Sequence, residues 1–185
     1  MARKQNEENS LQELKSAIRA KTPERLYIFH GEEKFLLHHY FSQLKNLLLD
    51  DLTESFNYHK FNSETFSLQS FLDSVEAFPM MAEHTLVHVD DVDLFKLPEG
   101  EREKIGETLG DIPDWCTVVF THETVNWKPD KRLKKLWEPI QANAEIVDFQ
   151  KQNQRELISW VSRHFMARGK RISNDLCAYL IEITD

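Results

Sequence analysis

The chain has 185 residues, of which 41% are hydrophobic and 29% are charged, and its formal net charge is −8. Twelve Phe, four Trp and four Tyr supply more apolar surface than a disordered chain carries, while no apolar run approaches the roughly 18 residues of a membrane helix. The acidic balance argues against a protein that coats nucleic acid unaided, and Cys116 and Cys177 lack metal-ligand spacing, which predicts free thiols in a reducing cytoplasm.

The first part of the chain predicts helices and short strands in alternation. A capping box at Ser10–Glu13 predicts the start of a first helix, after a polar and frayed segment 1–9. A short apolar strand follows at Arg25–Phe29, and apolar residues at helical spacing predict an amphipathic helix over Leu37–Leu48. A second strand at Phe56–Phe61 is less hydrophobic, so we expect it near an edge of the sheet.

The alternation continues up to residue 149. Ser67 is the expected cap of a helix whose apolar stripe runs from Leu68 to Val75. The elements expected after it are a strand at Thr85–Val89, a charged helix within 96–110, a strand at Thr117–Thr121, a basic helix at Lys131–Trp137 and a strand at Ala144–Asp148. Five strands separated by helices predict an α/β fold for residues 1–149, with three layers and a mostly parallel five-stranded sheet.

Residues 150–185 contain only helical patterns. One apolar stripe runs from Leu157 to Phe165, and a second follows Ser173, which is placed to cap the last helix. Two helices are too few to bury both stripes, so we expect this segment to be the start of a helical domain in a truncated chain.

The turn after the first strand has the place of a P-loop but not its residues. The pattern G-x-x-x-x-G-K-[ST] lets backbone amides and a lysine hold phosphates while a hydroxyl binds magnesium. Counted from Gly31, its last three defined positions are filled by Leu36–His38, and Lys34 comes three residues too early for the lysine position. Glu32 and Glu33 add negative charge where a phosphate would lie. The topology resembles a nucleotide-binding fold, whereas the residues do not suit a nucleotide.

Other chemistry-bearing positions give weak signals. Asp90 and Asp91 end an apolar strand as a Walker B acid pair does, and Thr121 lies where a nucleotide sensor would. The alternative is that all three are ordinary polar residues at strand ends, since no phosphate site requires a metal. The eight histidines have no partners at metal-ligand spacing, and no G-x-S-x-G elbow marks a nucleophile. We therefore predict no catalytic residue, no cofactor and no metal site.

Five basic residues crowd the region between Trp127 and Trp137. They are Lys128, Lys131, Arg132, Lys134 and Lys135. They are suited to contact a nucleic-acid backbone or an acidic partner, or they form a solvated helix face whose apolar side packs on the sheet. The sequence leaves both interpretations open.

Four short stretches follow one another in a characteristic order and spacing. They are Leu26–Leu37 with its Gly-Glu-Glu turn, Phe56–Phe61, Phe78–Glu83 followed by Leu86 and Val87, and the basic stretch Lys131–Leu136. Taken together, these stretches resemble the N-terminal half of the delta subunit family of the bacterial DNA polymerase III clamp loader.

The resemblance implies an AAA+-like module that has lost ATP hydrolysis, followed by a partial helical lid domain at 150–185, with the family's collar domain absent. It implies a non-catalytic subunit that binds the beta sliding clamp and helps to open it for loading on primed DNA. The implied partners are delta-prime and the ATP-hydrolysing gamma/tau subunits of the same holoenzyme. We expect the chain alone to be largely monomeric.

The resemblance also implies a clamp-binding segment. Its residues would be Phe78, Pro79, Met80 and Met81, where the family usually has Leu-Phe in place of the two methionines, and Ala82 replaces a common glycine. Pro79 disfavours helical geometry at Phe78, which ends the preceding helix and lifts both methionines away from its core stripe. The alternative is that the methionines are core filler beneath the Thr85–Val89 strand.

Two other functions stay open. One is an ATPase of the same fold that uses Asp90, Asp91 and Lys34 in an unusual loop. The other is a nucleic-acid-binding domain built around residues 128–135, which predicts steep salt dependence of DNA affinity.

Overall fold

The computed structural model describes residues 2–151 and 154–184, and the chain divides into two compact units. The first unit spans Met1–Phe149 and the second Gln150–Asp185. Among the described residues, no helix combines the length and the apolar character that crossing a membrane requires.

The first unit is built on a five-stranded sheet with the strand order β2-β3-β4-β1-β5. The strands are β1 (Leu26–His30), β2 (Tyr58–Phe61), β3 (Thr85–Asp90), β4 (Cys116–His122) and β5 (Ala144–Asp148). Every neighbouring pair of these strands is parallel, so their carboxyl ends all lie along one edge, the carboxyl edge, and their amino ends along the other. The predicted parallel α/β class and the edge position of β2 are confirmed.

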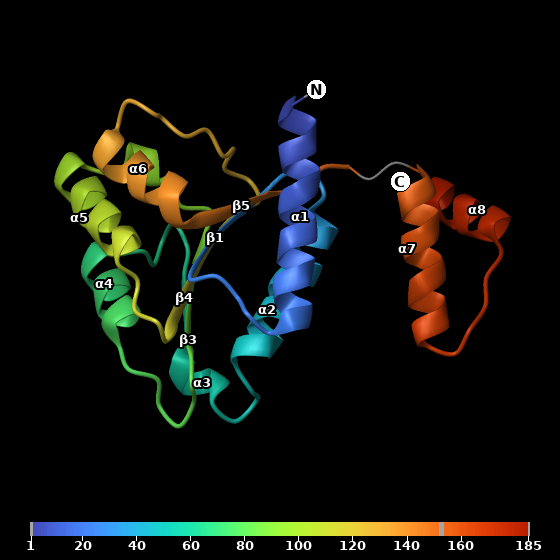
Figure 1. The fold of residues 1–185 in the computed structure, drawn as a ribbon, viewed down its shortest axis with the longest axis horizontal. Coiled ribbons are helices and arrows are strands. Elements are labelled where there is room, and N and C mark those ends of the chain that lie inside the picture. Colours follow the sequence, from blue (N-terminus) through green and yellow to red (C-terminus); the bar gives the residue numbers. More distant parts are fainter. Residues whose placement is uncertain (1, 152–153, 185) are drawn as a thin grey trace. The chain divides into compact units, whose positions relative to one another are not determined.

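Helices cover both faces of the sheet and give three layers (Figure 1). One face carries α1 (Ala2–Ala20) and α2 (Lys34–Leu48). The other face carries α4 (Leu68–Glu76), α5 (Glu99–Gly110) and α6 (Lys134–Asn143). Two short turns, α3 (Glu54–Asn57) and the 3-10 helix η1 (Leu94–Lys96), lie in the connections. The parallel strands are therefore linked by crossover helices, as such a sheet requires.

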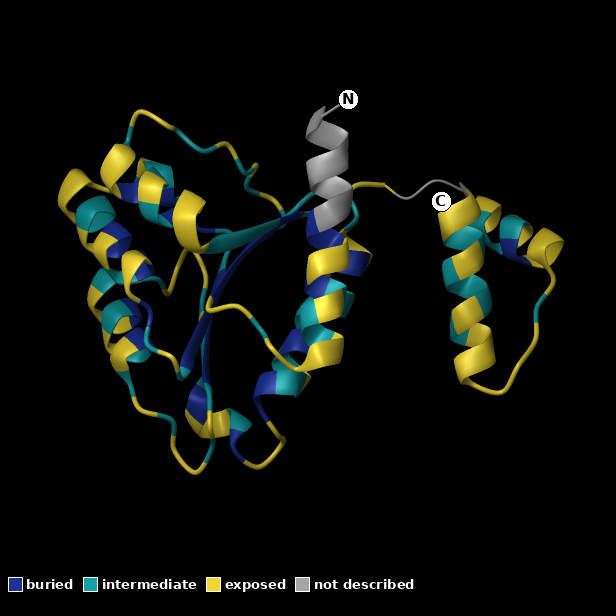
Figure 2. Cartoon of the chain, viewed as in Figure 1, coloured by how far each residue is buried: buried dark blue, intermediate teal, exposed yellow. Residues whose placement is uncertain are grey.

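The core lies on the two faces of the central strands, which Figure 2 shows as buried. Leu26, Ile28 and Phe29 of β1 have no exposed surface, and Val87 and Phe120 of the neighbouring strands are equally buried. A strand that is covered on both faces consists of a continuous run of apolar residues, and such runs predicted these strands. The predicted Ser67 cap is also confirmed, because its hydroxyl accepts a hydrogen bond from the Ser70 N–H at 3.2 Å.

Close packing of α5 against α6 depends on Gly106. Pro139 lies inside α6 and has no N–H to donate to the Lys135 carbonyl one turn earlier. That carbonyl faces Gly106, where an added Cβ would overlap its oxygen atom. The absence of a side chain at Gly106 lets the two helix backbones approach at this point.

The starts of α1 and α6 differ from the predictions. Helix α1 begins at Ala2, so Ser10 lies inside it and the predicted capping box with a frayed segment 1–9 is wrong. Residues 2–9 are rich in Arg, Lys, Gln and Glu, which favour helix. Helix α6 begins at Lys134 rather than Lys131, because the Asp130 carboxylate accepts the Arg132 N–H at 3.0 Å and forms a turn before the helix.

The second strand also starts later than predicted, at Tyr58 instead of Phe56. The residues before it form α3, and the Asp50 carboxylate fixes the preceding turn by accepting the Leu52 N–H at 3.0 Å and the Thr53 N–H at 2.8 Å. Asp and Asn side chains compete with strand pairing in this way.

The second unit contains two helices, α7 (Gln154–Ala167) and α8 (Asn174–Thr184). Ser173 caps α8, since its hydroxyl accepts the Leu176 N–H at 3.3 Å. Cys177 is fully buried, whereas the side chains of Leu176 and Tyr179 are 49% and 57% exposed. Within the described residues of this unit, the two helices bury their apolar stripes only in part, as the sequence predicted.

Candidate functional site

The connection between α4 and β3 exposes three large apolar side chains. Phe78 is 74% exposed, Met80 58% and Met81 91%. Helix α4 ends at Glu76, in line with the restriction that Pro79 places on the residue before it. The alternative that both methionines are core filler beneath β3 is wrong.

The main chain of this exposed segment is held by a buried amide, Asn57. Asn57 is 1% exposed, and its Oδ1 accepts the Met80 N–H at 2.6 Å. Its Nδ2 donates to the Met80 carbonyl at 2.9 Å and to the Thr53 carbonyl at 3.0 Å. A buried amide with its partners in place has a fixed orientation, so the backbone of Met80 is fixed while its side chain faces solvent.

A second anchor lies on the other side of the segment, at Trp115. The rings of Phe78 and Trp115 stack with centroids 4.3 Å apart and an interplanar angle of 21°. The Trp115 Nε1–H donates to the carbonyl of Ala77 at 3.1 Å. Met81 has φ 56°, a left-handed conformation that a methionine adopts only where its surroundings impose it. The segment is therefore pre-organised to present its side chains.

At the carboxyl edge of the sheet, Asp91 is bonded to the loop after β4. Its carboxylate accepts the N–H groups of Glu123 and Thr124, at 2.7 and 2.9 Å, and the Thr124 hydroxyl at 2.8 Å. It also accepts the Val125 N–H at 3.1 Å. Burial raises the pKa of Asp91, but these hydrogen bonds outweigh burial and hold the pKa below its usual value. Asp91 thus acts as a loop anchor, which favours the interpretation of an ordinary polar residue at a strand end.

Asp90 and Thr121 belong to a polar chain that crosses three strands. The Thr121 hydroxyl donates to Asp90 at 2.7 Å, and Lys60 lies 3.3 Å from the same carboxylate. Because that hydroxyl has one proton, His88 Nε2 must be the donor in its 2.8 Å contact with Thr121. His88 Nδ1 then accepts from the Tyr58 hydroxyl at 2.9 Å. Burial lowers the pKa of His88 to about 4, which keeps the ring neutral at pH 7.

The turn at Gly31, in the place of a P-loop, is filled by the main chain of Phe149. Gly31 has φ 128°, and an added Cβ there would overlap the Phe149 carbonyl oxygen. The Glu33 N–H donates to that oxygen at 2.8 Å, while the Phe149 N–H donates to the carbonyl of His30 at 2.7 Å. A backbone amide that would face phosphate in a P-loop is therefore bonded to the protein's own chain.

Trp127 covers the carboxyl ends of β1 and β4. Its ring centroid lies 5.0 Å from that of His122, 6.3 Å from that of His30 and 5.6 Å from that of Phe95. His30 and His122 are register partners at the ends of these strands, beside the point where the connections diverge. Ligands of open parallel sheets bind at that point, and here an indole fills it. The sequence analysis noted Trp127 only beside the basic residues and did not predict its contacts with the strand ends.

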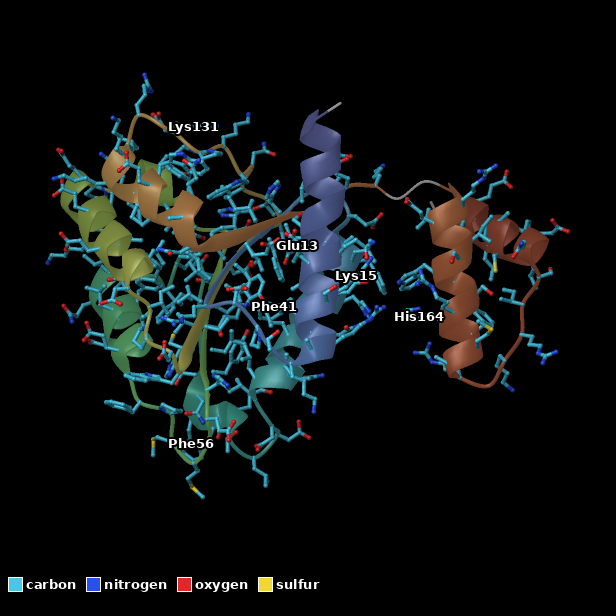
Figure 3. The ribbon with its side chains drawn as sticks, in the orientation of Figure 1. Glu13, Lys15, Phe41, Phe56, Lys131 and His164 are labelled. Carbon is cyan, nitrogen blue, oxygen red and sulfur yellow. The ribbon has the colours of Figure 1, made fainter. Side chains whose placement is uncertain are left out.

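The five basic residues are exposed, and acidic groups neutralise part of their charge. Arg132 pairs with Asp130 at 2.9 and 2.8 Å, and Lys135 pairs with Glu103 of α5 at 2.8 Å. Lys131, labelled in Figure 3, lies before α6 with its Nζ 5.6 Å from the Trp137 ring centroid. Lys128 and Lys134 are also exposed. The acidic helix α5 thus weakens the positive potential here, and contact with nucleic acid stays a prediction.

The cysteines and other potential metal ligands lie apart. Both Cys116 and Cys177 are free and buried, and burial raises the pKa of Cys116 to about 12. Over the side chains that the structure places, no three His, Cys, Asp or Glu residues come together in a metal-binding arrangement.

Comparisons with known proteins agree with this geometry. Residues 27–150 match the family model "DNA polymerase III, delta subunit". The chain is 25% identical over 161 residues to the Bacillus subtilis DNA polymerase III subunit delta, and the match covers 84% of this chain but only 46% of that protein.

Two solved structures share the fold. The Bacillus subtilis DNA clamp loader delta protein YqeN matches with a TM-score of 0.68 and 21% identity, over 91% of this chain and 51% of the other. A Thermotoga maritima protein related to the DNA polymerase III gamma subunit matches with a TM-score of 0.51 and 12% identity, over 91% and 57% of the two chains. The three-layer α/β fold predicted for the first unit is confirmed, because both structures share it. With the family model covering most of the first unit, the chain belongs to the DNA polymerase III delta subunit family.

Proposed function

We propose that this chain is a non-catalytic clamp-loader subunit that binds the beta sliding clamp and helps to open it for loading on primed DNA. Its clamp-binding segment is Phe78–Met81. The observation that carries the proposal is the contrast within this segment: Met80 and Met81 are 58% and 91% exposed, while Asn57 fixes the backbone of Met80.

The chemistry of the segment suits a plug that enters an apolar pocket. Methionine is flexible and polarisable, so it adapts to the shape of a preformed pocket. Burial of each side chain is worth roughly 1.5–3 kcal/mol. A backbone that is already ordered before binding loses little conformational entropy, so more of this free energy appears as affinity.

The remaining roles follow from the same proposal. Residues 1–149 form the clamp-binding domain, and residues 150–185 are the start of the lid domain. Hydrolysis of ATP belongs to the gamma/tau partners, in keeping with the Phe149 main chain that fills the Gly31 turn and with the internal bonds of Asp91. The subunit works with delta-prime and gamma/tau in the cytoplasm.

The test is the double substitution Met80→Ser with Met81→Ser. We expect the affinity for the cognate beta clamp, measured by calorimetric titration, to fall at least about a hundredfold, since every 1.4 kcal/mol is tenfold. The melting temperature should barely change, because both side chains are exposed. A folded double variant that binds the clamp as tightly as the unmodified chain would overturn the proposed site.

A further inference from the structure

Two more large apolar side chains are exposed on the segment that precedes β2. Leu52 is 85% exposed and Phe56 is 53% exposed. Resting on the proposed function, we propose that Leu52 and Phe56 contact the same clamp, so that the binding surface is composed of two segments, residues 50–57 and Phe78–Met81.

A single side chain joins the two segments. The Nδ2 atom of Asn57 donates to the Thr53 carbonyl at 3.0 Å and to the Met80 carbonyl at 2.9 Å. Both carbonyls therefore lie around one nitrogen atom, which brings the neighbours of Thr53 and Met80 in the chain close together in space. Leu52 precedes Thr53, and Phe56, labelled in Figure 3, precedes Asn57 itself.

The segment that carries Leu52 is ordered by its own hydrogen bonds. The Asp50 carboxylate accepts the N–H groups of Leu52 and Thr53 and the Thr53 hydroxyl, at 3.0, 2.8 and 2.9 Å. The hydrogen bonds from Thr53 hold the pKa of Asp50 below its usual value. Glu54 pairs with Lys45 of α2 at 2.9 Å. Leu52 and Phe56 are thus exposed on a fixed backbone, as Met80 is.

Exposed apolar side chains concentrate on these two segments. In residues 10–149, the large hydrophobic side chains that are exposed are Phe35, Leu52, Phe56, Phe78, Met80 and Met81. All but Phe35 lie on the two segments that Asn57 joins. A concentration of this kind marks an interaction surface, whereas single exposed hydrophobic residues do not.

The charges beside these side chains indicate what the clamp pocket offers. Residues 50–57 include Asp50 and Asp51 and contain no basic residue, and Glu83 follows the methionines. The charge of Glu54 is paired with Lys45 of α2. An apolar surface with an acidic border is complementary to an apolar pocket with a basic border. The clamp surface that receives Leu52 and Phe56 is accordingly apolar with basic residues beside it.

The experiment compares Leu52→Ser and Phe56→Ser with Phe35→Ser, each titrated with the cognate beta clamp at one salt concentration. Phe35 is 58% exposed, close to the 53% of Phe56, but lies at the start of α2, outside both segments. We expect Leu52→Ser and Phe56→Ser each to weaken binding at least about tenfold. Phe35→Ser should bind as the unmodified chain does, and the melting temperatures should differ little.

Hydrogen exchange gives a readout that needs no substitution. We expect the clamp to slow exchange of amides in residues 50–57 as well as in the Phe78–Met81 segment. Loss of binding in Met80→Ser with Met81→Ser, but unchanged binding in both Leu52→Ser and Phe56→Ser, would overturn the two-segment surface and leave the proposed function standing. Unchanged binding in the methionine variant would overturn the proposed function, and the inference with it. A stable dimer of the chain that Leu52→Ser dissociates, with no protection by the clamp, would assign the surface to a second copy instead.

Discussion

The two edges of the sheet use opposite chemistry. At the carboxyl edge, Asp91 binds the loop after β4, the Phe149 main chain fills the Gly31 turn and Trp127 covers the ends of β1 and β4. At the amino edge, the connections into β2 and β3 have bonded backbones but apolar side chains directed to solvent. In open parallel sheets, ligands usually bind at the carboxyl edge. Here that edge is closed by the protein's own groups, and the exposed surface lies at the other edge.

The same architecture can provide a nucleotide site or a protein-binding surface, and the two have different requirements. A nucleotide site needs unsatisfied backbone amides and a carboxylate that can hold a metal ion. A protein-binding surface needs apolar side chains on an ordered backbone. The carboxyl edge does not meet the requirements of a nucleotide site, and the amino edge meets those of a protein-binding surface. Particular residues are responsible at each edge, so their substitution tests this difference.

The largest effect on stability is expected from Gly31→Ala at the carboxyl edge. The new Cβ would overlap the Phe149 main chain in a backbone conformation that alanine rarely adopts. We expect the free energy of unfolding, measured by urea denaturation, to fall by about 3 kcal/mol or more. The control is Gly100→Ala, because a Cβ there meets nothing within 4 Å. Equal stability of the two variants would show that the contact with Phe149 is not tight.

A smaller effect is expected from Asn57→Asp at the amino edge. The carboxylate still accepts the Met80 N–H but has no proton to donate to the carbonyls of Met80 and Thr53. The carbonyls of Thr53 and Met80 would then face a carboxylate, and we expect a loss of about 1–3 kcal/mol in the free energy of unfolding together with weaker clamp binding.

The matched control is Asn62→Asp. The Asn62 Oδ1 accepts hydrogen bonds from the Glu64 N–H, the Thr65 N–H and the Thr65 hydroxyl, all of which a carboxylate also accepts. This variant should keep both its stability and its affinity for the clamp. If Asn57→Asp behaves in the same way, the amide of Asn57 does not hold the clamp-binding segment.

The smallest effect concerns the sheet face under α1, away from both edges. Burial, and next the Glu13 carboxylate of α1, raise the pKa of Glu145 to about 7. Because the pKa of Glu145 is higher in the folded chain than in the unfolded chain, protonation of Glu145 stabilises the fold. This contribution is complete below about pH 4.3, the pKa of Glu in an unfolded chain, and is lost as pH rises through about 7. We expect Glu145→Gln to be more stable than the unmodified chain at pH 8 by roughly 1–2 kcal/mol, a discounted value for a half-buried group.

The measurement is the difference in urea stability between the variant and the unmodified chain, at pH 5 and at pH 8. His88 and His122, whose pKa burial lowers to about 4, change stability in the opposite direction as pH falls below about 6.5. They are present in both chains and cancel in the difference. Parallel pH profiles would contradict the raised pKa, and clamp affinity should be the same in both chains.

Local patterns predicted the fold because the central strands are buried on both faces. The apolar runs of β1, β3 and β4 were located to within a residue or two at each end. The starts of β2 and α6 were misplaced because Asp50 and Asp130 form turns that propensity alone does not show. Pro79 was a sufficient local signal for the end of α4.

The contacts that define the two edges were not visible in the sequence. Asn57 lies 23 positions from Met80, and nothing near it in the chain marks it as an anchor. Asp91 had two interpretations, which only its bonds to residues 123–125 distinguish. These residues are distant in the chain, and the order of the strands in the sheet brings them together. The sequence alone does not give that order, so it does not identify the partners.

The position of Phe149 has a mechanical consequence for the chain. It is the last residue of the first unit, and its main chain is bonded to both His30 and Glu33. Its fully buried ring meets Phe29 edge-on at 5.3 Å and stacks on Tyr40 at 6.1 Å. Tension that enters the first unit at Gln150 acts first on these bonds and rings, before it reaches the sheet. A pull on the chain after Phe149 would therefore have to break the bonds of Phe149 to His30 and Glu33 before it could strip β5 from β1.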